Sequence, residues 1–557
     1  MILNGARIIV ESLKKEGVKY IFGYPGGAVI PLFDELFING KELKLVSPRH
    51  EQGATHMADG YARSTGDVGV VMVTSGPGAT NTVTGIATAY MDSVPLVVIT
   101  GQVSTSMIGS DAFQEIDIIG ITIPITKANF LVKDVNDLAY TIKHAFHLAK
   151  TGRPGPVLID IPVDVQKAET EFIYPKQTDI KSYRPKKHGH PKQIKAAIEL
   201  LKKAHRPILL VGGGCVISDA REEILKFIDK VKVPVLATLM GRGVVPSDHP
   251  LYFGGLGMHG TFYGNKAAQK ADLIIALGVR FSDRITGNAK KFATDAKVIH
   301  IDIDPAEIGK NVPVDIPIVG DIKNVMQEFN KVLDFKIEYK EWLDKIRGEK
   351  IKYPLTYKKD NGLKPQYLIE LASKYFPKDR IVISDVGQNQ MWVAQFFDMY
   401  YPKSFLTSGG LGTMGYALPA GIGAKVGNPD KEVLIVSGDG GFQMNIQELM
   451  TIARYNFAVK ILVLDNNYLG MVRQWQELFY GKRYSATEMH DNPDFAKLAE
   501  IIGIKSVTLD NPDDAEKVMK EFAESKESML IHAYVEKEEN VMPMVPPGAT
   551  LADTMSV

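Results

Sequence analysis

Two polar turns that follow apolar runs hold the residues best suited to chemistry. Gly438-Asp439-Gly440 follows the run VLIVS, and Asp465-Asn466-Asn467 follows the run ILVL. If both runs are parallel strands, their carboxyl ends meet at the edge of a sheet where α/β proteins bind ligands. A carboxylate and an amide oxygen suit a Mg²⁺ ion that bridges to a diphosphate, and glycines let backbone N–H groups approach the phosphates.

Either turn alone is typical of Asp and Asn as ordinary turn formers after a strand. Together, with Asp439 and Asn466 separated by 27 positions (466 − 439), the two turns predict a cation and diphosphate site built on one strand–helix–strand crossover. The chain contains no GxxxxGK[ST] sequence. The predicted phosphate site is therefore not a Walker-type loop.

Short runs of Val, Ile and Leu alternate with helix-length segments along the 557 residues. Runs that are apolar at every position are typical of strands buried on both faces, and hence of parallel sheets covered by helices. Because a single core stops growing near about 300 residues, several domains are required. The sequence predicts an α/β protein with doubly wound parallel sheets. Examples of these runs are VGVVMVTS, PLVVITG, PILLVGGG, ADLIIALG and KVIHIDID.

Two polar stretches that contain Lys and Pro, residues 168–192 and 335–365, are predicted to be linkers. They divide the chain into predicted domains 1–167, 190–335 and 365–557. Residues 70–101 also align with residues 433–466 as a weak repeat, in which Pro77 takes the place of Asp439. Two βαβ units that look alike by chance are the alternative explanation.

The overall composition excludes several classes of protein. Lys plus Arg and Asp plus Glu both number 65, so no strong field of one sign draws nucleic acid or an anionic membrane. The single cysteine, Cys215, has no partner for a disulfide or a CxxC metal site. The N-terminal segment lacks the apolar core of a signal peptide, and no apolar run reaches the ~18 residues of a membrane span. We therefore expect a soluble, cytoplasmic protein without a nucleic-acid or membrane partner.

A further acidic residue connects these turns to a known family. In SPRHEQGATHMADGYAR, Glu51 opens a predicted helix, where an acidic side chain is ordinarily just a favourable first-turn charge. With the GDG and NN turns, however, the chain resembles the large catalytic subunits of the acetohydroxyacid (acetolactate) synthases, which depend on thiamine diphosphate. The resemblance runs from the N-terminal helix to near the C-terminus.

This resemblance implies a pyrimidine-binding first domain, an FAD-binding middle domain and a diphosphate-binding third domain. It implies that Glu51 hydrogen-bonds the aminopyrimidine ring and activates the cofactor. It also implies that Mg²⁺ is held by Asp439, by the side chain of Asn466 and by the backbone carbonyl of Tyr468, where relatives often carry His. The two halves of the site come from different subunits in this family, so a homodimer or homotetramer is expected.

The resemblance assigns more residues to the site. Met414 corresponds to the bulky residue that bends the cofactor, and Trp475 to the residue that favours 2-ketobutyrate as second substrate; from pattern alone Met414 is a core residue and Met471 with Trp475 a buried pair. Val163 stands where several relatives carry Lys, so the role of that Lys does not transfer. The predicted thiamine diphosphate contacts are Val386, Gly387, Gln388, Asn389, Gly412, Met414, Gly440, Gly441, Gly470 and Met471. The predicted catalytic residues beside Glu51 are Gly27, Gln114 and Lys127, and the predicted substrate pocket is Phe113, Met471, Trp475 and Arg284.

The middle domain has only a weak dinucleotide signal of its own. Three glycines follow the buried run PILLV, without a convincing GxGxxG. The resemblance to the biosynthetic synthases implies FAD there, with a largely structural role because the reaction needs no net electron transfer. The implied FAD contacts are Arg153, Gly212, Gly213, Gly214, Thr238, Leu239, Met240, Gly257, Met258, His259, Gly278, Arg280, Asp283, Asp302, Ile303 and Asp321.

The implied activity is biosynthetic acetolactate synthase. Such an enzyme decarboxylates pyruvate and joins the remaining two-carbon unit to pyruvate, giving 2-acetolactate, or to 2-ketobutyrate, giving 2-aceto-2-hydroxybutyrate, in branched-chain amino-acid biosynthesis. A separate small regulatory subunit is expected. The alternatives are pyruvate oxidase, glyoxylate carboligase, which should lack the Glu51 carboxylate, and a regulatory pseudoenzyme.

Overall fold

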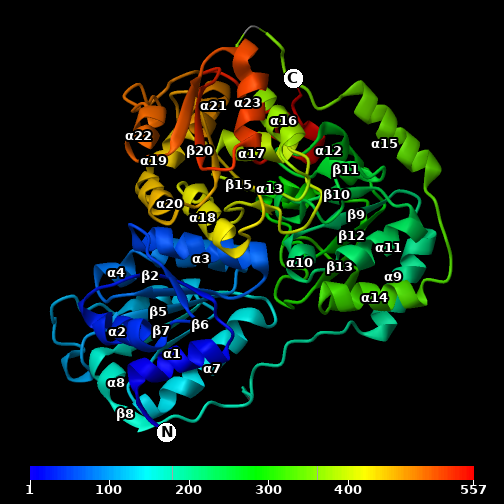
Figure 1. The fold of residues 1–557 in the computed structure, drawn as a ribbon. Helices are drawn as coiled ribbons and strands as arrows, with labels where there is room; N and C mark the ends of the chain where they lie inside the picture. The colour runs from blue at the N-terminus through cyan, green and yellow to red at the C-terminus, as the bar shows by residue number, and fades with distance from the viewer. Residues whose placement is uncertain (179, 361, 557) are drawn as a thin grey trace.

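The computed structural model describes residues 1–178, 180–360 and 362–556. Within these residues the chain forms three six-stranded sheets in which every neighbouring pair of strands is parallel, beside one small antiparallel pair, β1 (Ile2–Asn4) with β8 (Glu169–Glu171). This architecture confirms the predicted α/β class with doubly wound parallel sheets (Figure 1).

The first sheet has the order β3-β2-β4-β5-β7-β6 and the third has the order β16-β15-β17-β18-β20-β19. Counted along the chain, both follow the same order, 2-1-3-4-6-5, which confirms the predicted repeat. The strands are β2 (Tyr20–Tyr24), β3 (Lys44–Val46), β4 (Gly69–Val73), β5 (Leu96–Gln102), β6 (Ala128–Leu131), β7 (Val157–Pro162), β15 (Ile381–Ser384), β16 (Phe405–Leu406), β17 (Val433–Gly438), β18 (Lys460–Asp465), β19 (Lys505–Leu509) and β20 (Met529–Tyr534).

The middle sheet differs, with the order β11-β10-β9-β12-β13-β14, or 3-2-1-4-5-6 counted along the chain. This is the strand order of dinucleotide-binding doubly wound folds, whose ligands lie where the order reverses. Its strands are β9 (Pro207–Val211), β10 (Val235–Ala237), β11 (Tyr252–Gly255), β12 (Leu273–Leu277), β13 (Lys297–Asp302) and β14 (Ile316–Val319).

Helices cover both faces of each sheet (Figure 1). Those of the first domain are α1 (Gly5–Lys15), α2 (Ile30–Asn39), α3 (Glu51–Thr65), α4 (Pro77–Thr80), α5 (Val83–Asp92), α6 (Ile118–Thr122), α7 (Leu138–Lys150) and α8 (Val163–Lys167). Those of the middle domain are α9 (Pro191–Lys203), α10 (Gly213–Ile217), α11 (Arg221–Val231), α12 (Phe262–Gln269), α13 (Asp283–Thr286), α14 (Ile322–Val332) and α15 (Lys340–Lys352). Those of the third are α16 (Pro365–Tyr375), α17 (Gln388–Phe396), α18 (Ala417–Gly427), α19 (Asp439–Gln443), α20 (Leu449–Tyr455), α21 (Gly470–Phe479), α22 (Phe495–Ile501) and α23 (Ala515–Glu524).

The first and third domains share one hydrophobic core, in which α3 lies directly against α18 (Figure 1). The contact is backbone to backbone, because a Cβ on Gly60 would lie 2.0 Å from the Ala420 carbonyl oxygen and one on Gly423 would lie 1.8 Å from that of Met57. Any side chain at these glycines would force the helices apart. The position of Glu51, the first residue of α3, is therefore fixed by the third domain of the same chain.

Two segments pack on the middle domain although they lie outside the predicted range 190–335. Helix α15 falls in the stretch 335–365 predicted as a linker, and Trp342, Leu343 and Ile346 join the middle-domain core. Their spacing places them on one face of a helix, which explains why a polar stretch still folds. Near the C-terminus, Val545 and Leu551 also belong to that core. Among the described residues, no helix is long and apolar enough to cross a membrane.

Candidate active site

A cavity of about 1310 Å³ opens between the three domains. The predicted diphosphate and magnesium residues all line it, and they come from the ends of β15, β17 and β18 and from the segment before α18. They lie together although they are spread over the chain, because the carboxyl ends of parallel strands point to the same edge of the sheet. These lining residues are Val386, Gly387, Gln388, Asn389, Gly412, Met414, Asp439, Gly440, Gly441, Asn466, Tyr468, Gly470 and Met471; Trp475 of the predicted substrate pocket lines the cavity as well.

Asp439 is buried where β17 passes into α19. Asn492 donates through Nδ2 to Asp439 Oδ2 at 2.8 Å and to Asp465 Oδ1 at 3.1 Å, so the two carboxylates are close neighbours. Burial, together with the charge of Asp465, raises the pKa of Asp439 to about 8. Asp465 is paired with His532 Nε2 at 2.9 Å, so the unfavourable effect of burying two neighbouring carboxyl groups falls on Asp439, where a bound cation would relieve it.

The other predicted ligands complete a hard-oxygen set. The Asn466 side chain accepts from the backbone N–H of Tyr468 at 3.1 Å, which folds the turn so that both residues line the cavity. Among the described residues, no group of three or more His, Cys, Asp and Glu side chains could hold a metal. A carboxylate, an amide oxygen and a backbone carbonyl, completed by diphosphate oxygens, therefore fit Mg²⁺ better than a metal that prefers nitrogen or sulfur ligands.

Asp385 and Gln474 support this region and were not predicted from the sequence. Asp385 is buried at the end of β15 and accepts from the backbone N–H groups of Val386 at 2.9 Å, Gly415 at 3.0 Å and Ala417 at 2.9 Å. It thus ties two cavity-lining loops together, and burial raises its pKa to about 6. Gln474 accepts from Gln388 Nε2 at 2.9 Å and anchors α21. The only sequence signal for Asp385 was its place directly after the run RIVIS.

The middle-domain half of the cavity contains most of the residues predicted to contact FAD. Gly212 and Gly257 are absent from the lining: Gly212 lies behind it, where a Cβ would meet the Gly278 carbonyl oxygen at 2.1 Å, and Gly257 packs on the backbone of Arg284. These glycines allow close backbone packing instead. The predicted FAD contacts on the wall are Arg153, Gly213, Gly214, Thr238, Leu239, Met240, Met258, His259, Gly278, Arg280, Asp283, Asp302, Ile303 and Asp321, and Arg284 of the predicted substrate pocket lies on it as well.

The predicted pyrimidine-binding residues form a separate group outside this lining. Glu51 is buried, with Oε2 accepting from Asn81 Nδ2 at 2.9 Å, beside the turn that contains Pro77. Gln114 packs over Gly76 of the same turn, whereas the Phe113 side chain is 88% exposed. Gly27 begins a short 3-10 helix, Gly27–Val29, just before α2. Neither Glu51, Gly27 nor Gln114 lines the cavity that contains Asp439 in the same chain.

Lys127 lies in a different environment from the one expected of a catalytic lysine. Its Nζ donates to the backbone carbonyls of Leu148 at 2.6 Å, Thr151 at 2.6 Å and Arg153 at 2.8 Å, and to the hydroxyl of Tyr183 at 2.8 Å. Burial lowers its pKa to about 8. The ammonium therefore caps the end of α7 and fixes the backbone at Arg153, a residue on the cavity wall.

Asp160 anchors the segment that carries Gln114. It is buried in β7 and accepts from Thr100 Oγ1 at 2.7 Å and from Gln102 Nε2 at 2.9 Å, and Gln102 also donates to the Ile116 carbonyl at 2.9 Å. Burial raises the pKa of Asp160 to about 7.

The contribution of Asp160 to stability is expected to fall by about 2 kcal/mol between about pH 5 and about pH 8. In the folded protein the carboxyl group is protonated below about pH 7, whereas in the unfolded chain it is ionised above about pH 4. Unfolding therefore releases a proton in this window and becomes easier as the pH rises. Urea unfolding at both pH values measures the fall, which should be smaller in Asp160→Asn; an equal fall in both proteins contradicts the assignment.

Comparison with known proteins agrees with this geometry. Residues 3–121, 194–329 and 385–533 match the family models for the N-terminal TPP binding domain, the central domain and the C-terminal TPP binding domain of thiamine pyrophosphate enzymes. The chain is 50% identical over 565 aligned residues to a probable acetolactate synthase large subunit from Methanocaldococcus jannaschii, covering 99% of this chain and 95% of that protein.

The chain belongs to the acetolactate synthase large-subunit family of thiamine pyrophosphate enzymes. Other members of the family are similar over nearly their whole length. The large subunit from Corynebacterium glutamicum is 48% identical, covering 99% of this chain and 90% of that protein. The large subunit from Haemophilus influenzae is 47% identical, covering 97% and 96% respectively. The predicted resemblance to acetolactate synthases is thereby confirmed.

Proposed function

We propose that the protein is the catalytic subunit of a biosynthetic acetolactate synthase, which converts two molecules of pyruvate to 2-acetolactate and CO₂. The observation that carries the proposal is the near-complete coverage of acetolactate synthase large subunits at 47–50% identity. Glu51, Asp439 and Asn466 support it, because they occupy buried positions with the chemistry that the cofactor requires. 2-Ketobutyrate as an alternative second substrate belongs to the same proposal.

When bound, thiamine diphosphate supplies the electron sink that the decarboxylation needs. Asp439, the Asn466 side chain and the Tyr468 carbonyl would hold Mg²⁺ against its diphosphate, and the glycines at 440 and 441 would offer backbone N–H groups. Met414, which also lines the cavity, would orient the rings. Glu51 would hold a proton at the aminopyrimidine ring, where its burial places the carboxyl group in a site of low dielectric.

FAD is proposed for the middle-domain half of the cavity. The reversal of strand order between β9 and β12 and the glycines 213 and 214 after β9 support a dinucleotide at this place. The Arg153 guanidinium lies on the wall, donating to Ser93 Oγ at 2.9 Å and pairing with Glu307 at 2.7 Å. The flavin would fill and order the cavity wall, since the reaction transfers no net electrons.

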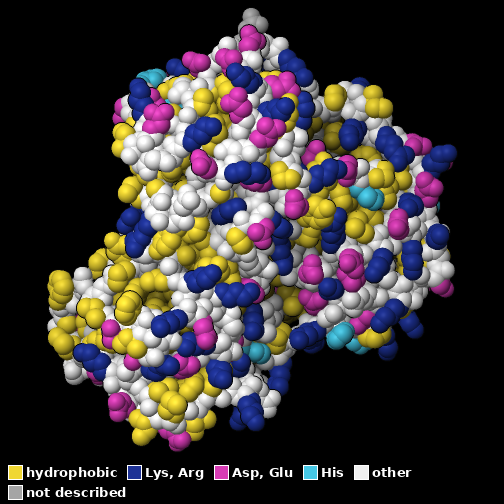
Figure 2. Space-filling view, viewed as in Figure 1, with side chains coloured by type: hydrophobic (Ala, Val, Ile, Leu, Met, Phe, Trp, Pro, Cys, Tyr) yellow, Lys and Arg dark blue, Asp and Glu magenta, His cyan; other side chains and the backbone are white. Residues whose placement is uncertain are grey.

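A homodimer or homotetramer is proposed because one chain does not bring Glu51 and Asp439 to one cavity. In Figure 2 hydrophobic side chains gather on the part of the surface formed by the first domain. Ile30 is 63% exposed, Phe37 85%, Phe113 88% and Ile123 63%, near the segments that carry Gly27 and Gln114. Burying such a surface against a second copy would remove it from water and bring in the missing half of the site.

The relatives are named large subunits, which supports a separate small regulatory subunit as partner. We also propose a cytoplasmic location, from the composition of the chain, and the domain divisions 1–167, 190–335 and 365–557, from the polar stretches between them.

The direct test is an acetolactate assay with thiamine diphosphate, Mg²⁺ and FAD each omitted in turn. The proposal expects the stripped protein to form product from pyruvate without oxygen consumption when all three cofactors are added back. It expects no product when any one of them is left out. Oxygen-dependent formation of peroxide and acetyl phosphate would instead establish a pyruvate oxidase.

Replacing Trp475 by Leu is expected to lower the preference for 2-ketobutyrate over pyruvate by about tenfold or more, because a pocket contact of this size is worth about 1–3 kcal/mol of discrimination. Trp475 lines the cavity and packs edge-on against Phe479, with ring centroids 5.9 Å apart. The ratio of the two products in a competition assay measures the change. Phe479→Leu, which alters the packing of the same ring from outside the cavity, is the matched control; equal ratios in the wild type and Trp475→Leu contradict the assignment.

A further inference from the structure

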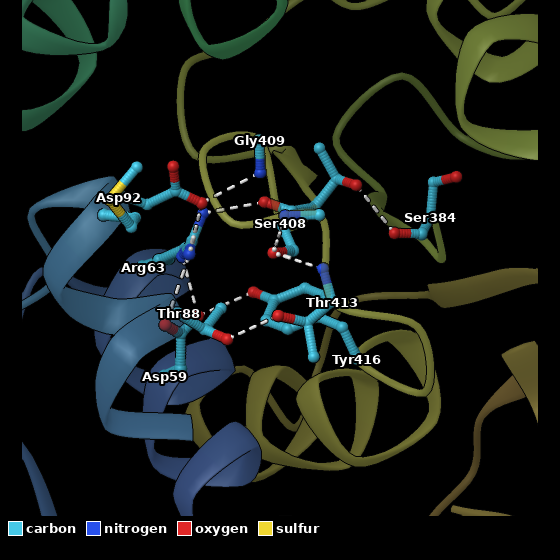
Figure 3. Close-up of polar contacts among 12 residues, drawn as sticks. Asp59, Arg63, Thr88, Asp92, Ser384, Ser408, Gly409, Thr413 and Tyr416 are labelled. Atoms are coloured by element: carbon cyan, nitrogen blue, oxygen red, sulfur yellow. Dashed lines mark hydrogen bonds and ion pairs between the residues drawn. The ribbon is translucent and has the colours of Figure 1, made fainter. Parts of the chain in front are cut away.

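A buried set of polar side chains joins the first domain to the segment Thr407–Tyr416 of the third domain (Figure 3). This segment runs between β16 and α18 without a helix or strand, and its residues Gly412 and Met414 line the cavity. The path of its backbone therefore decides where two of the proposed thiamine diphosphate contacts lie.

Arg63 on α3 ties both ends of the segment to the first domain. Its Nη1 donates to the Thr407 carbonyl at 2.9 Å, and its Nε lies 2.6 Å from Asp59 Oδ1. The hydroxyl of Tyr416, at the other end, donates to the same Asp59 oxygen at 2.6 Å. These contacts join two turns of one helix to the start and the end of the segment.

Asp92, at the end of α5, holds the middle of the segment. Its Oδ2 accepts from Arg63 Nη2 at 3.0 Å and from the backbone N–H of Gly409 at 2.9 Å. A Cβ on Gly410 would lie only 2.8 Å from Asp92 Oδ1, so the backbone is pressed against this carboxylate. From the preceding turn of α5, Thr88 Oγ1 bonds to Thr413 Oγ1 at 2.7 Å (Figure 3).

The same carboxylate also faces the middle domain. Asp92 Oδ1 is buried without a hydrogen-bond partner among the described residues, and Arg280 Nη2 lies 3.8 Å from it. Asp92 is thus the point at which all three domains meet beside the cavity.

Stability alone is a poor reason for such a cluster. The side chains of Asp59 and Asp92 are fully buried and that of Arg63 is 10% exposed, and buried ion pairs gain little over apolar packing because desolvation offsets their attraction. These contacts instead fix the position of the Thr407–Tyr416 segment, because each one ends on the segment or on a residue that bonds to it. Ser408, which accepts from Thr413 N at 3.0 Å, adds a tie within the segment itself.

We propose that Arg63 and Asp92 are positioning residues that hold the Thr407–Tyr416 segment, and with it Gly412 and Met414, in the shape that binds thiamine diphosphate. The inference rests on the proposed function, because it assumes that the cavity takes this cofactor. It assigns Arg63 and Asp92 to the thiamine diphosphate end of the cavity and gives them no direct contact with the reacting atoms.

The test measures two affinities in the full-length protein. Thiamine diphosphate is titrated by calorimetry into FAD-loaded protein with Mg²⁺, and FAD into stripped protein, for the wild type and for Asp92→Asn. Asp92→Asn removes the charge that Gly409 N–H and Arg63 share, so its dissociation constant for thiamine diphosphate is expected to rise about tenfold. The FAD dissociation constant is expected to rise clearly less than that of thiamine diphosphate, because Asp92 reaches the FAD half of the cavity only through Arg280, whose Nη2 lies 3.8 Å away.

Two further variants keep the result decisive. Thr88→Val is isosteric and removes the hydroxyl that bonds to Thr413 at 2.7 Å and donates to the Thr84 carbonyl at 2.8 Å. It is expected to weaken thiamine diphosphate binding in the same direction, with a smaller loss of thermal stability than Asp92→Asn, and it decides the question if Asp92→Asn does not fold. Glu16→Gln is the matched control, because Glu16 and its nearest cation, Lys143 at 2.6 Å, do not line the cavity; Lys150, which does, lies 3.8 Å from Glu16. It should bind both cofactors as the wild type does.

Unchanged thiamine diphosphate affinity in Asp92→Asn and Thr88→Val, or an equal loss of both cofactors, overturns the inference. A wild-type protein that binds no thiamine diphosphate overturns the proposed function itself, so the two failures are distinguishable.

Discussion

Replacing Glu51 by Gln is expected to lower the turnover of acetolactate formation about 100-fold or more, while thiamine diphosphate still binds. Gln has the same shape and keeps an oxygen that can accept from Asn81, which donates to Glu51 at 2.9 Å. What it loses is the carboxyl group that can take up and return a proton at the aminopyrimidine ring. The change therefore removes proton transfer without removing the side chain.

The measurement is kcat at saturating cofactors, with thiamine diphosphate affinity determined separately. Glu223→Gln is the matched control: Glu223 is also a buried glutamate in the first turn of a helix, α11, and accepts from an amide, Gln327 Nε2, at 3.0 Å. It should leave kcat unchanged. Wild-type turnover in Glu51→Gln would remove the mechanism proposed for this residue.

Replacing Asp439 by Asn is expected to raise the Mg²⁺ and thiamine diphosphate concentrations needed for half-maximal activity by at least about 100-fold. Mutating a residue that only supports a metal ligand typically lowers metal affinity by about 10–100-fold, and losing a direct ligand should lower it more. Without cofactors, the same change should leave the thermal midpoint unchanged or raise it. Asp439 and Asp465 lie close enough for Asn492 to bond both. Burial beside Asp465 already disfavours the ionised form of Asp439, so an uncharged amide suits the cofactor-free site at least as well.

The opposite signs of these two effects separate a ligand from a residue that merely supports the fold. Cofactor titrations and thermal unfolding of the stripped protein are compared with those of Asp510→Asn. Asp510 also follows a strand of the third sheet, β19, but lies outside the cavity lining. A lower midpoint in stripped Asp439→Asn, with cofactor affinity retained, would make Asp439 a structural residue.

The sequence predicted the elements well because the strongest signals were local. Fully apolar runs such as those before Asp439 and Asp465 can be buried on both faces only in a parallel sheet, and the glycines after them mark the strand ends. The weak repeat in which Pro77 takes the place of Asp439 indicated that the first and third domains are alike, and the strand order that they share came from the structure. The meeting of the two turns at one cavity followed from sheet topology alone.

What the sequence did not show depends on contacts between distant segments. Asn492 and His532, which bond to Asp465 at 3.1 and 2.9 Å, lie in unremarkable sequence. The carbonyl cage around Lys127 requires a helix end and a loop to come together in space. Helix α15 was hidden because its three buried apolar residues stand among charged residues. A polar sequence pattern predicts that most of its side chains are exposed. It does not identify the few polar side chains that the fold buries.

The backbone contact between α3 and α18 also determines how amino-acid changes act in an assembled enzyme. That contact holds α3, which begins at Glu51, against the third domain, and Glu51 does not line the cavity that contains Asp439 in the same chain. In the proposed two-fold assembly, each chain would therefore contribute residues to two reaction centres, and neither centre would be built from one chain alone. A chain defective at Glu51 and a chain defective at Asp439 could then assemble together. One reaction centre would carry both defects, and the other would carry neither. In the proposed assembly, the chain that carries a substitution would therefore not correspond to a single reaction centre.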